Sequence, residues 1–538
     1  MISRRIGAVS RREFLAMGGG ALAGVALGVL PAQADKSCGK PKYGGHLRIG
    51  ERYHAQTLDP HKQVAFIETM NAMLMFNGLT DRGSLPEVNI YPALAESWEI
   101  SEDGRTYTFR LRAAKFHNGK EVTAADVKYS IGRIRDPKTA SPRERDLFAL
   151  DSVDVVDRRT VRLNLKEAYG PMLHKLTVQV TPIIPEGTSY TDGTPPPGTG
   201  PFVFKEWRLN EYTRFVRNKD YYEKGLPYVD MVSVIGIPDA TARFTALRTG
   251  EIDWLTTLPL GRVPMLQKNP PPGITVFVSK GMGRHQIFFN LKDQVLGKPN
   301  PFSDVRVRRA VAYAIDKKEI LQGASWGYGD VLQGQVYSPL EPWSVDVSDY
   351  AQNLEKARAL LAEAGYPKGF KALLPLRSDD PRKRGSEVTA AQLKKIGIEL
   401  ELKLLADAEY YRTVNRMREF TITYEALPYR DDPDDGYYLY LHSKSPSNPT
   451  GYANPEFDRL LEEARGLTGR EERKKVYKKV VEKIHEDVPW IWTHSNNLPY
   501  AWRDYLKCDC APGEENCFGF GGWFASANGG FKRVWLDK

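Results

Sequence analysis

The sequence predicts a protein of mixed α-helices and β-strands that folds as two or more lobes, in an α/β or α+β arrangement. The chain has 538 residues, whereas a single hydrophobic core stops growing at about 250–300 residues. Apolar residues make up 41% and charged residues 27% of the chain, which is the ordinary balance of a globular protein. Segments with the two-residue period of strands stand between segments with the period of helices, and this mixture predicts the fold class.

Three segments alternate apolar and polar residues, which predicts half-buried strands. They are residues 107–111, 161–165 and 398–404, and the last of them alternates strictly. A hairpin turn at residues 103–104 is expected to join the first strand to the strand-like residues 97–100.

Helices are predicted by start and stop signals around segments with one apolar face. A Thr-x-x-Asp start at Thr123 precedes one helix. Asn454-Pro455 begins another, with proline at the tolerated first position. Further helices are predicted at residues 307–323, 354–364 and 471–485.

Residues 1–34 have the pattern of an export signal. The pair Arg11-Arg12 precedes an apolar run over residues 16–30, and Ala32-Gln33-Ala34 supplies small residues for cleavage. A charged head, a short apolar middle and a small-residue end are typical of secretory signals. The arginine pair resembles a twin-arginine signal, and a general secretory signal that carries two arginines is the alternative. We therefore expect export to the periplasm with cleavage near Ala34.

Charge and cysteines predict a mildly basic protein with disulfides. Removal of the signal takes away four arginines and one glutamate, so the net charge falls from +9 to +6. Such a small charge over about 500 residues predicts no nucleic-acid partner. The four cysteines are Cys38, Cys508, Cys510 and Cys517, and an oxidising compartment permits disulfides between them. Their pairing stays open. The alternatives are a metal site, for which the zinc-ribbon spacing is missing, and free thiols.

Eight segments in a fixed order resemble one protein family, the periplasmic solute-binding proteins of ABC importers for dipeptides, oligopeptides and nickel (solute-binding protein family 5). The resemblance covers nearly all of residues 45–535. Most shared residues, such as Trp98 and Phe109, supply apolar area to a sheet or form turns, so they identify the fold rather than the ligand. The segments are residues 57–61, 94–112, 115–119, 123–127, 198–202, 250–253, 302–310 and 452–458.

The resemblance implies an α/β, two-lobed periplasmic-binding-protein fold (class II-like, large cluster) with an extra subdomain and a hinge between the lobes. Lobe one would comprise residues 35–285 and 491–538, with the extra subdomain at 81–198, and lobe two would span 286–490. Periplasmic binding proteins close around their ligand. The resemblance also implies a monomer without cofactor, metal or catalytic residues, which delivers its solute to an inner-membrane ABC permease driven by a separate ATPase.

In peptide-binding members of the family, an aspartate of lobe two pairs with the α-ammonium of the ligand shortly before an acidic residue and a proline. Here that step is Asp432-Pro433. Counting back from it places Tyr429 at the position of the aspartate, whereas counting forward from Phe420 places Arg430 there, and Asp431 is adjacent.

A second departure lies in lobe one. Arg143 follows the family segment at residues 136–142, where oligopeptide binders often have a ligand-facing tyrosine. Guanidinium groups suit carboxylates and phosphates, so we expect a solute with an anion, such as a modified peptide, an opine-like conjugate or a sugar phosphate. The alternative is that Arg143 and Arg430 are solvated or paired with Asp431 or Asp434.

Tyrosines around the same loop are predicted to line the cleft, because tyrosine combines apolar contact area with an orienting hydroxyl. The alternative is a tyrosine-rich surface that binds nothing. The residues are Tyr410, Tyr411, Tyr424, Tyr429, Tyr437 and Tyr438.

Other functions fit single features of the sequence. Residues 323–327 match the G-x-S-x-G motif of serine hydrolases around Ser325, but they follow a predicted helix instead of a strand. Nine histidines are compatible with a carrier of nickel or a metal chelate, although no pair has i, i+4 spacing on a helix. A carrier of sugar derivatives with the same fold is a further alternative.

Overall fold

The computed structural model describes residues 40–83, 89–191, 193–332, 343–345, 347–427, 432–509 and 530–538. Its largest sheet is mixed, because β1 is parallel to β10 and β11 while the other neighbouring strands are antiparallel. The strand order is β17 (Ile422–Leu427), β12 (Ile274–Phe289), β18 (Trp490–Arg503), β11 (Trp254–Leu255), β1 (His46–Glu51), β10 (Met231–Gly236), β9 (Tyr212–Arg217) and β8 (Phe202–Arg208).

A second sheet is antiparallel and has the order β4 (Ala95–Ile100), β5 (Thr106–Leu111), β7 (Thr160–Leu165) and β6 (Leu150–Asp157). Two predicted strands and the predicted hairpin are confirmed here. Helix α2 (Ala124–Arg135) covers this sheet, and its start is the predicted one, since Thr123 and Asp126 form a capping box. Buried Tyr107, Phe109 and Val127 form part of the core between them.

The third predicted strand is β16 (Ile398–Leu405), which pairs in parallel with β15 (Phe370–Arg377). Its alternation does not give a half-buried strand along its whole length, because Leu402 and Leu404 are 39% and 57% exposed. The remaining strand pairs are short. They are β2 (Thr80–Arg82) with β3 (Ile90–Pro92), β13 (Gln294–Val295) with β14 (Lys298–Pro299), and β19 (Leu506–Cys508) with β20 (Val534–Leu536).

The helix predicted over residues 307–323 is wrong in one respect, since the structure divides it in two. The first helix ends at Ala314 with extended backbone at Ile315, and Asp316 then caps the second through the amides of Lys318 and Glu319. The other predicted helices are confirmed. The helices are α1 (Phe66–Met75), α3 (Met172–Lys175), α4 (Ala240–Thr249), α5 (Val263–Lys268), α6 (Val305–Ala314), α7 (Lys317–Ser325), α8 (Leu354–Glu363), α9 (Asp380–Lys394), α10 (Asp407–Tyr410), α11 (Pro433–Leu441), α12 (Pro455–Gly466) and α13 (Arg470–Asp487).

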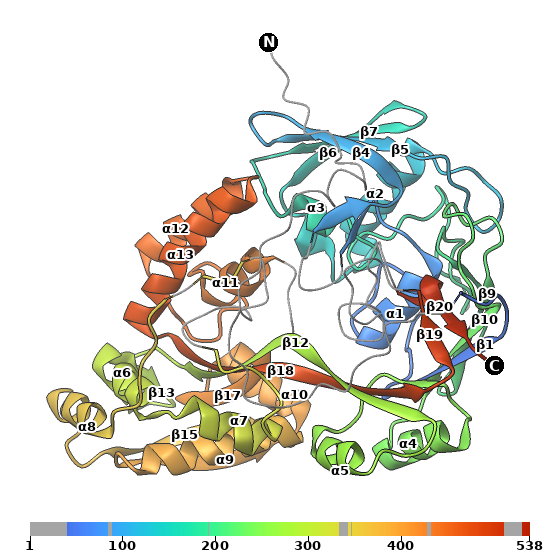
Figure 1. Ribbon diagram of the computed structural model, residues 1–538. Coiled ribbons are helices and arrows are strands. Elements are labelled where there is room, and N and C mark those ends of the chain that lie inside the picture. The colour runs from blue at the N-terminus through green and yellow to red at the C-terminus, as the bar shows by residue number, and fades with distance from the viewer. Residues whose placement is uncertain are drawn as a thin grey trace, which may run out of the picture.

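These elements form two lobes, which we name by their elements (Figure 1). Lobe one contains α1–α5, β1–β11, β19 and β20, whereas lobe two contains α6–α13 and β13–β17. Strands β12 and β18 run through both. The predicted boundaries fall inside β12 and at the start of β18, and they stay a prediction. Among the described residues, no helix combines the length and the apolarity that a bilayer crossing requires.

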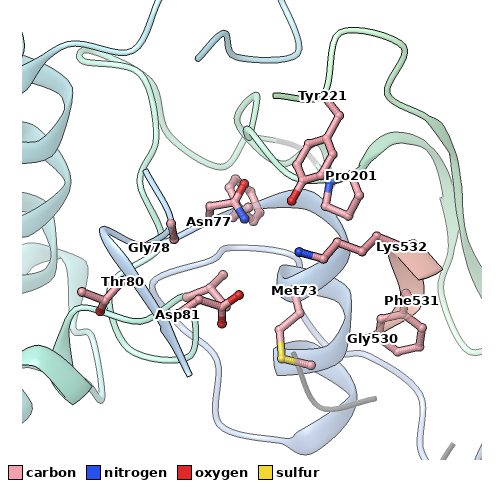
Figure 2. Close-up of a pocket in the computed structure, with 13 residues that line it drawn as sticks. Met73, Asn77, Gly78, Thr80, Asp81, Pro201, Tyr221, Gly530, Phe531 and Lys532 are labelled. Carbon is pink, nitrogen blue, oxygen red and sulfur yellow. The ribbon is translucent and has the colours of Figure 1, made fainter. Parts of the chain in front are cut away.

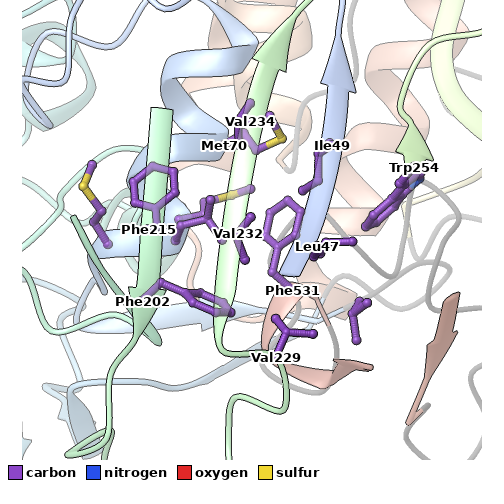
Figure 3. Close-up of a cluster of buried hydrophobic side chains, with 14 of the residues drawn as sticks. Leu47, Ile49, Met70, Phe202, Phe215, Val229, Val232, Val234, Trp254 and Phe531 are labelled. Atoms are coloured by element: carbon purple, nitrogen blue, oxygen red, sulfur yellow. The ribbon is translucent and has the colours of Figure 1, made fainter. Parts of the chain in front are cut away.

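The core of lobe one joins distant parts of the chain. Leu47 and Ile49 of β1 pack among side chains of β8–β10 and α1, and Phe531 from the C-terminal segment enters the same cluster (Figure 3). The rings of Phe531 and Trp254 are 6.0 Å apart. Lobe one is therefore completed only after the chain returns from lobe two.

Candidate functional site

Strands β12 and β18 form the floor between the lobes. Residues 274–279 pair with residues 498–503 on the side of lobe one, and residues 284–289 pair with both β18 and β17 on the side of lobe two. The register shifts between Ser279 and Gly283, and a Cβ at Gly281 would lie only 1.7 Å from the carbonyl oxygen of Asn496. Irregular ladders bend and twist more than regular ones, so this stretch is suited to be the hinge.

The wall on the side of lobe one lies at the carboxyl end of β1, between the parallel strands β10 and β11. Ligands of open α/β sheets bind outside such strand ends. Glu51 ends β1 and is buried, and its carboxylate accepts hydrogen bonds from the Thr256 hydroxyl and, at 2.8 Å, from the Arg52 amide. Burial raises the pKa of Glu51, although these bonds offset part of the effect. The following side chains, Arg52 and Tyr53, are exposed at this edge.

The wall on the side of lobe two is an acid–base cluster at the carboxyl ends of β15, β16 and β17. Arg382 in the first turn of α9 donates to the carboxylates of Glu425 and, at 2.9 Å, of Asp379. Burial opposes the charge of Arg382, but the two carboxylates outweigh it and raise its pKa. Arg377 ends β15 and donates to Asp407 at 2.9 Å. The cluster is therefore a fixed array of charges at this edge.

The two walls lie within electrostatic reach of each other. The hydrogen bond from Arg377 is the main cause of the lowered pKa of Asp407, and the positive charge of Arg52 in lobe one contributes to it. Within the described ranges, Arg52 forms no ion pair of its own. A solute between the walls would meet, on one side, a guanidinium that has no acidic partner among the described residues and stands over the ring of Tyr53 at 5.1 Å, and paired charges on the other.

The lobes also touch directly, where α3 meets α11. The ammonium of Lys175 is 3% exposed and donates to both carboxylate oxygens of Asp435, at 2.5 and 2.7 Å. Burial disfavours the ammonium, but the carboxylates of Asp435 and Asp146 outweigh it, and the pKa of Lys175 is raised. This pair holds α3 and α11 together.

A second set of contacts crosses the same interface. The Tyr169 hydroxyl donates to Asp434 at 3.3 Å, and Arg465 donates two hydrogen bonds of 2.9 Å to that carboxylate. The Gly170 amide donates to the carbonyl of Arg465 at 2.8 Å. We call the groups that join α3 and its flanking residues to lobe two the latch. They are Tyr169, Gly170, Lys175, Asp434, Asp435 and Arg465.

Asp432, a predicted ligand residue, lies beside the latch and is fully buried. Its carboxylate caps α11 and accepts two hydrogen bonds from Arg473, at 2.6 and 2.7 Å. His174 of lobe one is 4.0 Å away. Burial alone would raise the pKa of Asp432, but the charge of Arg473 outweighs it and lowers the pKa to about 2. A direct contact of Asp432 with the solute stays a prediction.

Arg143 belongs to lobe one and Tyr410 to lobe two. Arg143 is half-buried with its guanidinium 3.7 Å from Asp146, the acid that also lies 4.0 Å from Lys175 of the latch. Asp431 lies outside the described residues, so the predicted pairing of Arg143 with Asp431 or Asp434 stays a prediction. Tyr410 is buried behind the wall of lobe two, with its hydroxyl 2.9 Å from that of Thr423.

Tyr424 lies on the opposite face of the floor. It is buried, and its hydroxyl is 3.0 Å from Nδ1 of His285. A Cβ at Gly385 of α9 would clash with its ring at 2.2 Å, so Tyr424 packs tightly under α9. Tyr429, Arg430 and Asp431 lie outside the described residues. The ligand contacts of these predicted residues stay predictions.

Ser325 of the G-x-S-x-G segment is buried at the end of α7. Its hydroxyl is 2.9 Å from Nε2 of His494, and the ring of His494 stacks on that of His285 at 4.4 Å. Burial lowers the pKa of both imidazoles, to about 3 for His494. The motif stands at the end of a helix instead of on a strand-to-helix turn, so the nucleophile elbow of hydrolases is not formed.

A separate hollow lies inside lobe one between the end of α1 and the C-terminal segment (Figure 2). The polar groups of Asn77, Asp81, Tyr221 and Lys532 point toward its centre. Burial raises the pKa of Asp81 to about 7, and the charge of Lys532 offsets only part of this. All its lining residues belong to lobe one, so the hollow is not part of the interface between the lobes.

Other sequence predictions meet the structure only in part. Cys508 is disulfide-bonded, while Cys38, Cys510 and Cys517 lie outside the described residues. Within the described ranges, no three His, Cys, Asp or Glu side chains lie close enough together to hold a metal ion.

The two walls and the latch were not predicted from the sequence. Arg52 and Arg382 follow strand ends, which is a readable signal, whereas nothing in the sequence relates Lys175 to Asp435.

The two lobes and the strands that cross between them define the fold of the periplasmic binding proteins. The family model described as "bacterial extracellular solute-binding proteins, family 5 middle" matches residues 89–448 of this chain. The chain therefore belongs to family 5 of the bacterial extracellular solute-binding proteins, the solute-binding components of ABC importers for peptides and related solutes.

Individual relatives agree with this assignment. Heme-binding protein A of Haemophilus influenzae is 33% identical over 440 residues, which cover 75% of this chain and 78% of that protein. Glutathione-binding protein GsiB of Pectobacterium atrosepticum is 27% identical over 460 residues, 83% and 87% of the two chains. The periplasmic binding protein DppA of Helicobacter pylori, solved with the peptide STSA, has a TM-score of 0.74 at 25% identity and covers 92% of this chain and 99% of its own. These relatives are binding proteins, not enzymes.

Proposed function

We propose that this protein is exported to the periplasm as a monomer, binds a peptide-like solute with an anionic group between its lobes, and delivers it to an inner-membrane ABC permease. Membership in family 5 supports a peptide or related solute. Two relatives are named for heme and for glutathione. Both compounds carry carboxylates, which supports the anionic group.

The observation that carries the anionic group is Arg52. Its side chain is exposed at the carboxyl end of β1, where solutes of α/β sheets bind. Within the described residues it has no acidic partner, although it lies close enough to Asp407 to influence the pKa of that carboxyl. A guanidinium binds a carboxylate with two parallel hydrogen bonds.

Closure would follow from contacts on both walls. A solute that pairs with Arg52 and also touches the Arg382 cluster binds the closed state better than the open state, and this difference alone shifts the population toward closure. The latch adds contacts between the lobes that do not involve the solute. Its strength therefore sets how much binding energy the solute must contribute.

The test is isothermal titration of the mature protein with glutathione and with trialanine amide, which has a free amino group and no carboxylate. We expect glutathione to bind the more tightly. Arg52→Met should weaken the binding of glutathione by about tenfold or more, since a hydrogen bond to a charged group contributes about 1.5–3 kcal/mol.

Arg110→Met is the matched control. Arg110 is also exposed on lobe one, but it lies on β5 and faces Glu96 at 3.3 Å. Equal binding of trialanine amide and glutathione, or an equal loss in the two variants, would refute the anionic group while leaving the family assignment intact.

A further inference from the structure

The floor between the lobes contains a buried amide side chain that forms no hydrogen bond with any described residue. Gln286 of β12 is fully buried, and among the described residues neither its amide nitrogen nor its amide oxygen has a partner. It stands directly across from Trp492 of β18 and Glu425 of β17. The Glu425 carboxylate accepts hydrogen bonds from Arg382 and from the Ala426 amide, both on Oε1, and no hydrogen bond from Gln286 to it is formed.

Another buried glutamine, by contrast, has both polar groups of its side chain paired. Gln392 of α9 is equally buried, but its oxygen accepts from the Asp316 amide at 2.9 Å, and its nitrogen donates to the Asp316 carbonyl and to Glu319 at 3.1 and 2.8 Å. An unsatisfied buried polar group costs about 1–3 kcal/mol. Such groups in native proteins point to a missing water, ion or ligand.

The unsatisfied amide lies on the side of the floor where a solute is expected. Its neighbours on the same face, Phe288 of β12 and Trp492 of β18, belong to the core under α11. Ile287, which stands between Gln286 and Phe288 along β12 and points to the other face, belongs to the core under α7 and α9. Figure 1 shows α11 on the side of β12 and β18 that faces α3 of lobe one, with α7 and α9 on the other side. Gln286 therefore lies on the face of β12 that is turned toward α11, which is the side on which α3 of lobe one also lies.

Trp492 adds a second unsatisfied group on this face. Its indole nitrogen is buried and has no hydrogen-bond partner within the part of the chain that the structure describes. Together, the pair offers three N–H donors and one carbonyl acceptor. The N–H and C=O of one residue in an extended peptide point to the same side, as they do in a hydrogen-bonded pair of antiparallel strands. A primary amide can bond both at once.

We propose that Gln286, assisted by Trp492, determines specificity by binding the N–H and C=O of one main-chain unit of the solute. This inference rests on the proposed function, since Gln286 would be the residue that recognises the peptide-like part of the solute. The anion at Arg52 and the amide at Gln286 are then recognised by different elements, β1 and β12.

The test compares Gln286→Met, which keeps the length of the side chain, with Gln392→Met as the matched buried control. Titration with glutathione measures affinity, and thermal denaturation without solute measures stability. We expect Gln286→Met to bind glutathione 10–100-fold more weakly while its melting temperature stays equal or rises. Gln392→Met should melt at a lower temperature and bind glutathione as the wild type does.

Two results would overturn the inference alone. They are unchanged glutathione affinity in Gln286→Met, and a fall in its melting temperature as large as that of Gln392→Met, which would assign Gln286 to a buried water within the fold. If wild-type protein binds neither glutathione nor trialanine amide, both this inference and the peptide-like part of the proposed function fail.

Discussion

The latch makes a prediction that does not depend on the identity of the solute. Lys175→Met keeps the apolar stem of the side chain and removes the ammonium that donates twice to Asp435. Hydrogen bonds to charged groups contribute about 1.5–3 kcal/mol. Because the Asp435 side chain is 28% exposed, water replaces part of the lost hydrogen bonding, and we use the lower end of this energy range. The closing equilibrium should then fall by about tenfold, since 1.4 kcal/mol corresponds to a factor of ten.

The Gly170 amide reports on this equilibrium, because its hydrogen bond to the carbonyl of Arg465 crosses the interface at 2.8 Å. Hydrogen exchange, read by mass spectrometry on a peptide that contains Gly170, should accelerate about tenfold in Lys175→Met. Amides of β5 and β7 should keep their protection, which shows that lobe one stays folded.

Lys166→Met is the control, because Lys166 is exposed and donates only within lobe one, to the Phe148 carbonyl at 3.2 Å. Asp435→Asn and the double variant complete a double-mutant cycle, in which the two single effects should not add. Unchanged exchange at Gly170, or full additivity, would refute the idea that this ion pair holds the lobes together.

Three further predictions concern the fold. Gly281→Ala should lower the free energy of unfolding by about 1–3 kcal/mol in a denaturant titration, because the new methyl would meet the Asn496 carbonyl. Asp432→Asn should cost about 3–5 kcal/mol, because it leaves the buried Arg473 without its acid. The wild-type contribution of that pair is present above the ordinary aspartate pKa and is lost as pH falls toward about 2. Asp81→Asn should be more stable than the wild type at pH 8 and equal to it at pH 4, since the raised pKa of about 7 means that folding favours the protonated acid.

Each of these has a result that contradicts it. For Gly281, the comparison is Gly132→Ala in α2, where no atom lies within 4 Å of the new Cβ and helix propensity should raise stability. Equal effects of the two substitutions would rule out the close approach. An Asp432→Asn variant that keeps the acid-induced loss of the wild type, or an Asp81→Asn variant whose advantage does not grow with pH, would remove the assigned physical cause.

The local signals in the sequence predicted much of the secondary structure. The Thr123 capping box, the Asn454 cap and the alternation in residues 107–111 each depend on residues close along the chain, and the structure contains all three. The break after Ala314 was missed, because Val307 and Ala314 keep the helical period while Asp316 restarts the helix.

The site was less predictable, because its contacts join residues far apart in the chain. Lys175 and Asp435 are 260 positions apart, and no spacing rule relates them. Tyr424 was expected in the cleft, yet strand alternation places it with Ile287 under α9, while its neighbour Glu425 lies with Gln286. A shift of one residue in a strand exchanges the two faces, and the sequence alone did not determine which face belongs to the solute.

The chain enters lobe two along β12 and returns along β18, and these two strands pair on both sides of the register shift between Ser279 and Gly283. A paired ribbon yields to twisting but resists sliding along its length. The halves of the molecule can rock about the ribbon without shearing past one another. If the lobes close around a solute as proposed, the size of the solute would set the angle between them.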